Sequence, residues 1–424
     1  MAISVNVTCP AAGATPILDC LQPLPKRKRW KKSVGWVIWI AVILTLPWTP
    51  ELTQRSTYWS AMLHVLDLTV KTFFGTMLSP VGASATFSLL LVWLALYCAV
   101  IIHELGHVIA GLAVRFQTNF LIIYPFRFTR TRTGWAVRRE KLVSVSGAAS
   151  MLPQSFENLR PRLMIYVLGG PAANLLTFLL LRAWLPNVAQ APNQTILFLE
   201  SLANMSLFLG AANLLPFQAG GFQSDGARVL MAAAKEQKFL RWYALVRLGT
   251  AMAGGTRARD LDPAVIQQAL ELNDSSGDGM RANLIAYSWA ADREDVAAAA
   301  AYLEKCLAYA DKLPNRTRCF LMLEAAVLQG WYREDAGRAV HWLNLAGTAR
   351  KRLPAVYRLR PEIAVAWADG HSAEAEARLQ EAIAEVRKMP ANAARDLLET
   401  SMTEWQQKMQ LRLHARQASS AVSG

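Results

Sequence analysis

Long apolar runs with few charged residues are confined to the first half of the chain. Four of them can be distinguished, at residues 33–48, 84–114, 163–185 and 195–217. A helix needs about 20 apolar residues to cross a bilayer, so this pattern predicts a membrane protein with four spans. The first run is the shortest, and we expect Trp30 and Trp48 to anchor its ends at the membrane interfaces.

Basic residues adjoin these runs and predict their orientation. Residues 26–32 read KRKRWKK, and residues 115–162 carry nine Lys or Arg against two acidic residues. Positively charged loops stay in the cytoplasm, so four spans place both termini there, most simply in a bacterial inner (cytoplasmic) membrane. Within the second segment, LIIYPFRFT and WAVRRE flank Thr133-Gly134 and predict a β-hairpin.

From Ala227 onward the chain has the pattern of a soluble helical protein. Three segments resemble one another, each with an apolar helix ending near a tryptophan, an acidic turn and an Ala-rich helix that closes at a proline. The tryptophans are Trp289, Trp331 and Trp367, and the prolines are Pro314, Pro354 and Pro390. This period is close to that of tetratricopeptide helix pairs, although the standard tetratricopeptide residues are not clearly present. Such repeats form a concave surface for protein partners, and the alternative is a plain helical bundle.

Composition and charge agree with a chain that is part membrane-bound and part soluble. Hydrophobic residues make up 53% of the chain and charged residues 18%, against about 25% charged in an average soluble protein. A net charge of +14 invites a nucleic-acid-binding interpretation, but basic residues beside apolar spans orient a membrane protein, and no nucleic-acid partner is expected. The five cysteines show no CxxC spacing, which excludes a disulfide framework and a cysteine zinc site.

The motif His103-Glu104-Leu105-Gly106-His107 lies toward the end of the second apolar run. Residues four apart share one face of a helix, so both imidazoles can bind one metal ion. Zinc binds imidazole and activates water, and Glu104 is placed to act as general base. A lone buried histidine is more often a satisfied core residue, but two histidines and a glutamate within hydrocarbon are costly without a partner. We therefore predict one zinc ion per chain.

A catalytic zinc site needs a third protein ligand and one open position. Most acidic residues before residue 226 lie in tails or loops, and Glu200 lies near the opposite membrane face. Asp225, at the cytoplasmic end of the last run, matches the depth of the histidine pair and is the predicted ligand. Pro216 and the glycines after it break the helix there, which is tolerated where backbone lines a wet cavity. The alternative role of Asp225 is the N-cap of a helix over 227–234.

Three motifs occur in order, each in or beside a span: HELGH at 103–107, GPAAN at 170–174, and NLLP at 213–216 followed by Asp225-Gly226. Together they resemble the site-2 protease family of intramembrane zinc metalloproteases, over roughly residues 84–235. The resemblance implies zinc bound by His103, His107 and Asp225, with Glu104 as catalytic base. It also implies cleavage of a transmembrane protein or peptide near the cytoplasmic face. The family commonly places fewer residues between the proline and the aspartate than lie here between Pro216 and Asp225.

The GPAAN segment allows two interpretations. Its small residues let helices approach closely in lipid, and that packing alone would account for them. Asn174 is in addition a candidate for binding the substrate strand or the oxyanion.

The sequence therefore predicts a mainly α fold: a four-span polytopic membrane protein with a short cytoplasmic β-hairpin insertion and a soluble C-terminal α-helical repeat domain. The expected parts are a basic cytoplasmic tail (1–32), a transmembrane metalloprotease domain (33–235), a linker (236–269) and a cytoplasmic helical-repeat domain (270–424). The predicted function is an intramembrane zinc metalloendopeptidase, with a cytosolic protein as partner of the repeats. The alternatives are a catalytically inactive scaffold that recruits cytosolic proteins through its repeats, and a zinc-dependent transporter or sensor.

Overall fold

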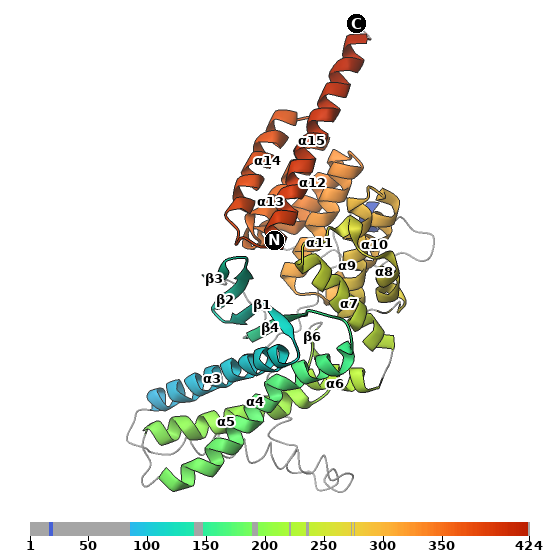
Figure 1. Cartoon of the computed structure of the whole chain (residues 1–424). Helices are drawn as coiled ribbons and strands as arrows, with labels where there is room; N and C mark the ends of the chain where they lie inside the picture. The colour runs from blue at the N-terminus through green and yellow to red at the C-terminus, as the bar shows by residue number, and fades with distance from the viewer. Residues whose placement is uncertain are drawn as a thin grey trace.

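The computed structural model describes residues 17–19, 85–139, 147–188, 194–219, 222–234, 237–272, 274 and 276–422. These residues are mainly helical and include a small antiparallel sheet. In the described part of the chain, three long helices occupy the lower end of the molecule in Figure 1, and a body of mostly shorter helices, with one long helix that leads to the C-terminus, occupies the upper end. The sheet lies between the two ends, beside their junction.

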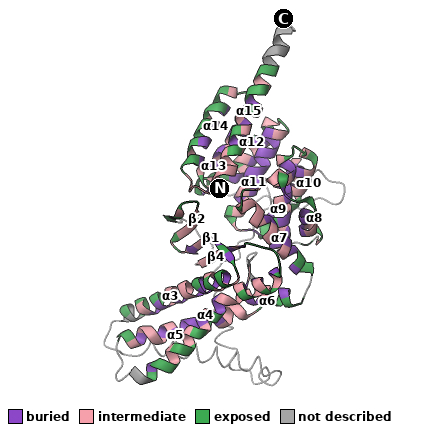
Figure 2. Cartoon of the chain, in the orientation of Figure 1, coloured by how far each residue is buried: buried purple, intermediate pink, exposed green. Residues whose placement is uncertain are grey.

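The long helices at the lower end are α3 (Ala85–Ala113), α4 (Leu159–Val188) and α5 (Gln194–Leu214), which pack against one another. Each contains a segment long and apolar enough to cross a membrane: Leu89–Ala113, Leu159–Pro186 and Gln194–Leu214. Their surfaces expose large apolar side chains such as Trp93, Ile109 and Leu179, and parts of these helices are green in Figure 2, the colour of exposed residues. Such a surface suits lipid. Three of the predicted spans thus correspond to membrane-compatible helices, and the run 33–48 lies outside the described residues.

Glycines bring α3 and α4 into backbone contact. A Cβ atom on Gly106 would lie 2.4 Å from the carbonyl oxygen of Gly169, and one on Gly169 would lie 2.4 Å from the Cβ of Ala110. Small residues at such a crossing let dispersion contacts hold two helices together in lipid. Close packing therefore accounts for Ala173 of the GPAAN motif and for Gly169, which directly precedes the motif, and the crossing fixes the HELGH turn against α4.

The insertion between α3 and α4 is a four-stranded antiparallel sheet. Its strands are β1 (Phe116–Ile123), β2 (Phe126–Thr131), β3 (Gly134–Arg139) and β4 (Gly147–Pro153), in the order β3-β2-β1-β4. The predicted hairpin corresponds to β2 and β3, with Thr131 opposite Gly134. The run 121–129, predicted as one strand, is divided into β1 and β2 by a turn at Tyr124-Pro125. Strand β4 gave no sequence signal, because GAASMLP has no β-branched residue.

The described residues after α5 form two short strands followed by a series of helices. The first of these elements are β5 (Gln218–Ala219), β6 (Phe222–Gln223), α6 (Asp225–Ala233), α7 (Gln237–Ala253), η3 (Ala258–Asp260) and α8 (Pro263–Leu270). Helices α7 and α8 share a hydrophobic cluster with α9 (Gly277–Asp292), through buried residues such as Leu248, Ile266 and Ala286. The described residues 237–269 of the predicted linker (236–269) thus pack as part of the helical body, because their apolar positions recur at helical spacing and bury against α9.

The remaining chain forms consecutive helix pairs. Helix α9 is followed by α10 (Val296–Ala308), α11 (Asn315–Val327) by α12 (Ala336–Ala346), and α13 (Ala355–Ala368) by α14 (Ser372–Arg387), before the long α15 (Ala393–Val422). The 3-10 turns η4 (Ala310–Lys312) and η6 (Gly347–Arg352) connect successive pairs, and a π turn, η5 (Leu328–Tyr332), extends α11. Pro314 and Pro354 occupy the N-caps of α11 and α13, at the closing positions that the sequence pattern marks.

The turns within the pairs share one backbone conformation. Glu294, Glu334 and Gly370 occupy equivalent positions and have left-handed φ angles of 61°, 52° and 80°. In the first two pairs the next residue, Asp295 or Asp335, accepts a hydrogen bond from the backbone N–H three residues later and so caps the second helix. The three similar sequence segments thus have similar local structure. Their membership of the tetratricopeptide class stays a prediction.

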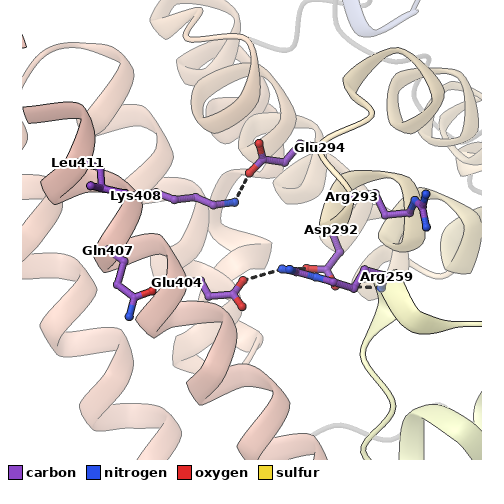
Figure 3. A pocket seen from close by; sticks show the side chains of 8 residues that line it. All are labelled: Arg259, Asp292, Arg293, Glu294, Glu404, Gln407, Lys408 and Leu411. Carbon is purple, nitrogen blue, oxygen red and sulfur yellow. Dashed lines mark hydrogen bonds and ion pairs between the residues drawn. The ribbon is translucent and has the colours of Figure 1, made fainter. Parts of the chain in front are cut away.

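Ion pairs connect α15 to the first part of the helical body. They line a cleft of about 570 Å³, shown in Figure 3, which none of the predicted metal-centre residues lines. Arg257 and Arg259 each bind both Asp292 and Glu404, and Lys408 on α15 binds Glu294. A network of several charges stabilises such a contact more than isolated surface ion pairs do.

Polar contacts join the helical body to the sheet and to α6. In the β2–β3 hairpin, Arg132 pairs with Asp396, and its backbone N–H donates to the carbonyl of Ala391 at 3.1 Å. On α6, Arg228 donates two hydrogen bonds, of 2.8 and 3.2 Å, to the buried carboxylate of Asp278 on α9. The helix that begins with Asp225 is thereby fixed to the helical body.

Candidate metal centre

The two histidines of the HELGH motif lie on one face of α3, one turn apart. Their Nε2 atoms are 3.2 Å from each other, and the rings meet edge to face with centroids 4.7 Å apart. His103 and His107 are 7% and 8% exposed. Burial of two facing imidazoles is costly unless a further group uses their lone pairs.

Asp225 completes this group from the start of α6. Its Oδ2 atom lies 3.2 Å from Nε2 of His103 and 3.5 Å from Nε2 of His107. Zinc holds such ligands at about 2.0–2.1 Å, and the edges of a tetrahedron of that size are about 3.3–3.4 Å long. The three atoms are thus spaced as three corners of a zinc tetrahedron. They form a group that could hold a metal ion, as the sequence predicts, whereas Glu200 is not part of it.

The local fold at the start of α6 explains how Asp225 reaches the histidines. Ser224 is the N-cap: its hydroxyl accepts from the N–H of Ala227 and donates to the carbonyl of Leu215 at 2.5 Å. The alternative role of Asp225 as N-cap is therefore wrong, because Ser224 fills that position and leaves the Asp225 carboxylate to face α3. Gly226 allows the approach, since a Cβ there would lie 1.8 Å from the carbonyl oxygen of Leu214.

A short hairpin accommodates the long spacing between Pro216 and Asp225. Strands β5 and β6 pair with Gln218 opposite Gln223 and Ala219 opposite Phe222. The N–H of Ser224 then donates to the carbonyl of Phe217 at 3.0 Å, which returns the chain to where it left α5. The additional residues thus form a side loop, and the aspartate stays within reach of the metal centre.

Glu104 lies beside the three ligand atoms and faces strand β4. It is 8% exposed, and its carboxylate accepts a hydrogen bond from the backbone of Ala149. Gly147 leaves room for it, since a Cβ on Gly147 would lie 2.6 Å from Oε1 of Glu104. This carboxylate is therefore next to the group that could hold a metal and is not one of its ligands, which is the placement expected of a general base.

Each histidine is oriented through its other ring nitrogen. Nδ1 of His107 lies 3.0 Å from the carbonyl oxygen of Tyr166, to which it donates, so Nε2 keeps its lone pair. Nδ1 of His103 lies 3.3 Å from the side-chain nitrogen of Asn174, which is fully buried and whose side-chain oxygen has no hydrogen-bond partner in this amide orientation. With that oxygen turned toward His103, Nδ1–H donates to it, and both polar groups are satisfied. Asn174 thus contacts a ligand, and its role toward substrate or oxyanion stays a prediction.

Gly170 forms the wall of the site opposite the two imidazoles. A Cβ atom there would lie 2.4 Å from Nε2 of His107 and 2.8 Å from Nε2 of His103. The glycine of the GPAAN motif is therefore needed at the metal centre itself, in addition to the packing role of Gly169.

The charge state of Asp225 suits a ligand. Burial alone would raise the pKa of this carboxyl, but its close contacts with the imidazoles of His103 and His107 outweigh the effect and hold the pKa below its usual range. The carboxylate is therefore ionised at neutral pH, as metal binding requires.

The sequence did not reveal the backbone groups and neighbouring residues that orient the side chains of this site. Tyr166 has three roles: its carbonyl orients His107, its ring lies 5.6 Å from the imidazole, and its hydroxyl donates to the carbonyl of Ala149 at 2.7 Å. Gly147 and Ser224 were likewise not recognised. Only Ser224 carried a usable signal, a serine just before a helical pattern.

The chain was compared with protein-family models, with curated proteins and with solved structures, and none of them matches it. The resemblance to site-2 proteases therefore rests on the three motifs and on the arrangement of their residues.

Proposed function

We propose that this protein is an intramembrane zinc metalloendopeptidase that hydrolyses peptide bonds of membrane-spanning substrates near the cytoplasmic face. The observation that carries the proposal is the spacing of the nitrogen and oxygen atoms of His103, His107 and Asp225, at 3.2–3.5 Å. Two imidazoles and one carboxylate are a donor set that zinc binds in hydrolases, with one position open. The two histidines lie toward the end of an apolar helix, so the site is within reach of substrates that are themselves in the membrane.

The residues of the chain supply the rest of the chemistry. A bound zinc ion would act as a Lewis acid toward the scissile carbonyl and lower the pKa of water. Glu104 takes a proton from the attacking water and passes it to the leaving amine. Tyr166 and Asn174 hold the imidazoles in the tautomer that leaves Nε2 free. Burial of Glu104, Asn174 and the two imidazoles keeps bulk water from competing.

The backbone next to Glu104 suits an extended substrate. In the described sheet β4 pairs with β1 on one side only, and its other edge has no strand partner, although the backbone of Ala149 already donates to Glu104 and accepts from the Tyr166 hydroxyl. Its residues Gly147 and Ala149 lie against Glu104. A substrate segment unwound from its helix would pair with this edge, and its peptide bonds would pass the metal centre.

The membrane topology that we propose has four spans, with both ends of the chain in the cytoplasm. An odd number of crossings would separate residue 19 from the helical body, and three candidate spans lie between them. Yet Ile17–Asp19 binds α10 of that body, so both lie on one side of the membrane. A further crossing among residues 20–84 would make the number of spans even and so agree with this contact. The apolar run 33–48 is the sequence candidate for that crossing. Basic residues on the sheet favour the cytoplasmic side.

The substitution Glu104→Gln tests the function. It preserves the size of the side chain and the metal ligands, so the purified variant should hold one zinc ion per chain, as the wild type does, and lose cleavage. New N-termini in membrane fractions of cells that express either form identify the substrates. Full cleavage by the variant would refute the proposal.

A further inference from the structure

The described N-terminal segment Ile17–Asp19 binds the helical body almost 300 residues later in the chain. It forms a 3-10 turn, η1, beside α10, visible as the blue segment in Figure 1. The side chain of Leu18 is 2% exposed and belongs to the same hydrophobic cluster as Leu307, Leu328 and Trp342. One short segment from a distant part of the chain thus occupies a pocket in the helical body.

The backbone of this segment is bound by polar side chains of the body. Glu304 accepts hydrogen bonds from the N–H groups of Ile17 and Leu18, the latter at 3.0 Å. The carbonyl of Leu18 accepts from the Gln329 amide at 2.7 Å and from the Trp342 indole at 3.1 Å. Every backbone contact is therefore made by a side chain, in the manner of a peptide-binding site.

Two of these donors are buried while the segment is bound. Gln329 is 0% and Trp342 1% exposed. If the segment leaves, both N–H groups lose this hydrogen bond and need water or another acceptor in its place. A peptide carbonyl at this position therefore satisfies both donors at once.

The acidic residue of the segment is also recognised. The carboxylate of Asp19 accepts a hydrogen bond of 2.8 Å from Arg333 and lies 3.9 Å from Arg338. Both arginines lie close to the π turn Leu328–Tyr332, which also carries Gln329. Single π turns within α-helices are frequent at functional sites, where they reposition side chains.

We propose that Glu304, Gln329, Arg333 and Trp342 form a binding site for a short peptide of the type aliphatic-Leu-Asp, which the Ile17–Asp19 segment of the same chain occupies and which a second such peptide can enter by displacing it. A segment of three residues binds weakly by itself, and its attachment to the chain raises its local concentration to the millimolar range. The tethered segment can therefore leave the site and be replaced by another peptide. The inference is independent of the metal centre.

The test measures binding of a labelled peptide, with the sequence of residues 13–23, to the detergent-solubilised full chain. The variant Leu18→Asp, whose own segment no longer fits the apolar pocket, should bind the peptide at least about tenfold more tightly than the wild type, because the competitor is removed. Adding Glu304→Gln should abolish this gain. Glu376→Gln, at an exposed position on α14, is the matched control and should preserve it. A peptide with its own Leu18→Asp change should not bind.

Hydrogen exchange in the wild type gives a second measurement that does not depend on variants. A saturating amount of the peptide should speed exchange at the N–H groups of Ile17 and Leu18, since the segment leaves the pocket. Absence of peptide binding to a folded Leu18→Asp chain, together with unchanged exchange in the wild type, would overturn the proposal and leave the segment as a fixed structural strap.

Discussion

Replacement of Gly170 by alanine should destroy metal binding without unfolding the protein. The added Cβ would lie 2.4 Å from Nε2 of His107, whereas ordinary contact begins at 3.4 Å, so the imidazole must move by about 1 Å. Helix α4 has no room to yield, because Gly169 is already in contact with Gly106. Zinc ligands tolerate displacements of only about 0.2 Å.

We therefore expect the zinc affinity of Gly170→Ala to fall about 100-fold or more, and cleavage to fall with it. Competition with a chelator of known affinity measures the first. The matched control is Gly249→Ala, on helix α7, where an added Cβ meets nothing within 4 Å. Both variants should stay folded, since alanine favours a helix over glycine. A Gly170→Ala protein that retains zinc and activity would refute the placement of α4 against the histidines.

Three further changes probe the support of the site and the stability of the helical body. Ser224→Ala removes the cap of α6 and should cost about 1–2 kcal/mol of stability, measured by thermal unfolding, and reduce zinc affinity. Asn174→Ala leaves Nδ1 of His103 without an acceptor and should weaken zinc binding about 10–100-fold, whereas a pure oxyanion role would lower kcat alone. Hydrogen bonding from Arg257 lowers the pKa of Glu404, so this carboxylate stabilises the fold above its unfolded pKa of about 4.3 and loses that contribution as pH falls through its folded pKa. Glu404→Gln should flatten the fall in melting temperature between pH 6 and pH 3.

The parts of the site that the sequence revealed were those with a fixed spacing or a unique charge. His103, Glu104 and His107 are read from helical periodicity, and Asp225 from the scarcity of acids near the right membrane depth. Their common location in the structure agrees with both arguments. Long apolar runs with few charged residues likewise located the three described spans.

The contributions that the sequence did not reveal depend on backbone positions in space. The carbonyl of Tyr166 and the open Cα of Gly147 have no sequence pattern, because any residue has a carbonyl and glycines have many roles. Strand β4 forms through pairing with β1 despite weak propensity. The docking of Leu18 joins positions too distant in the chain for any local pattern to indicate.

X-ray absorption at the zinc edge of the purified full-length protein tests the central claim most directly. We predict one zinc ion per chain with two imidazole nitrogens and a carboxylate oxygen at about 2.0–2.1 Å, and loss of the oxygen contribution in Asp225→Ala. A protein that contains no zinc after purification in zinc-supplemented buffer, or one whose zinc environment is unchanged in Asp225→Ala, would contradict it.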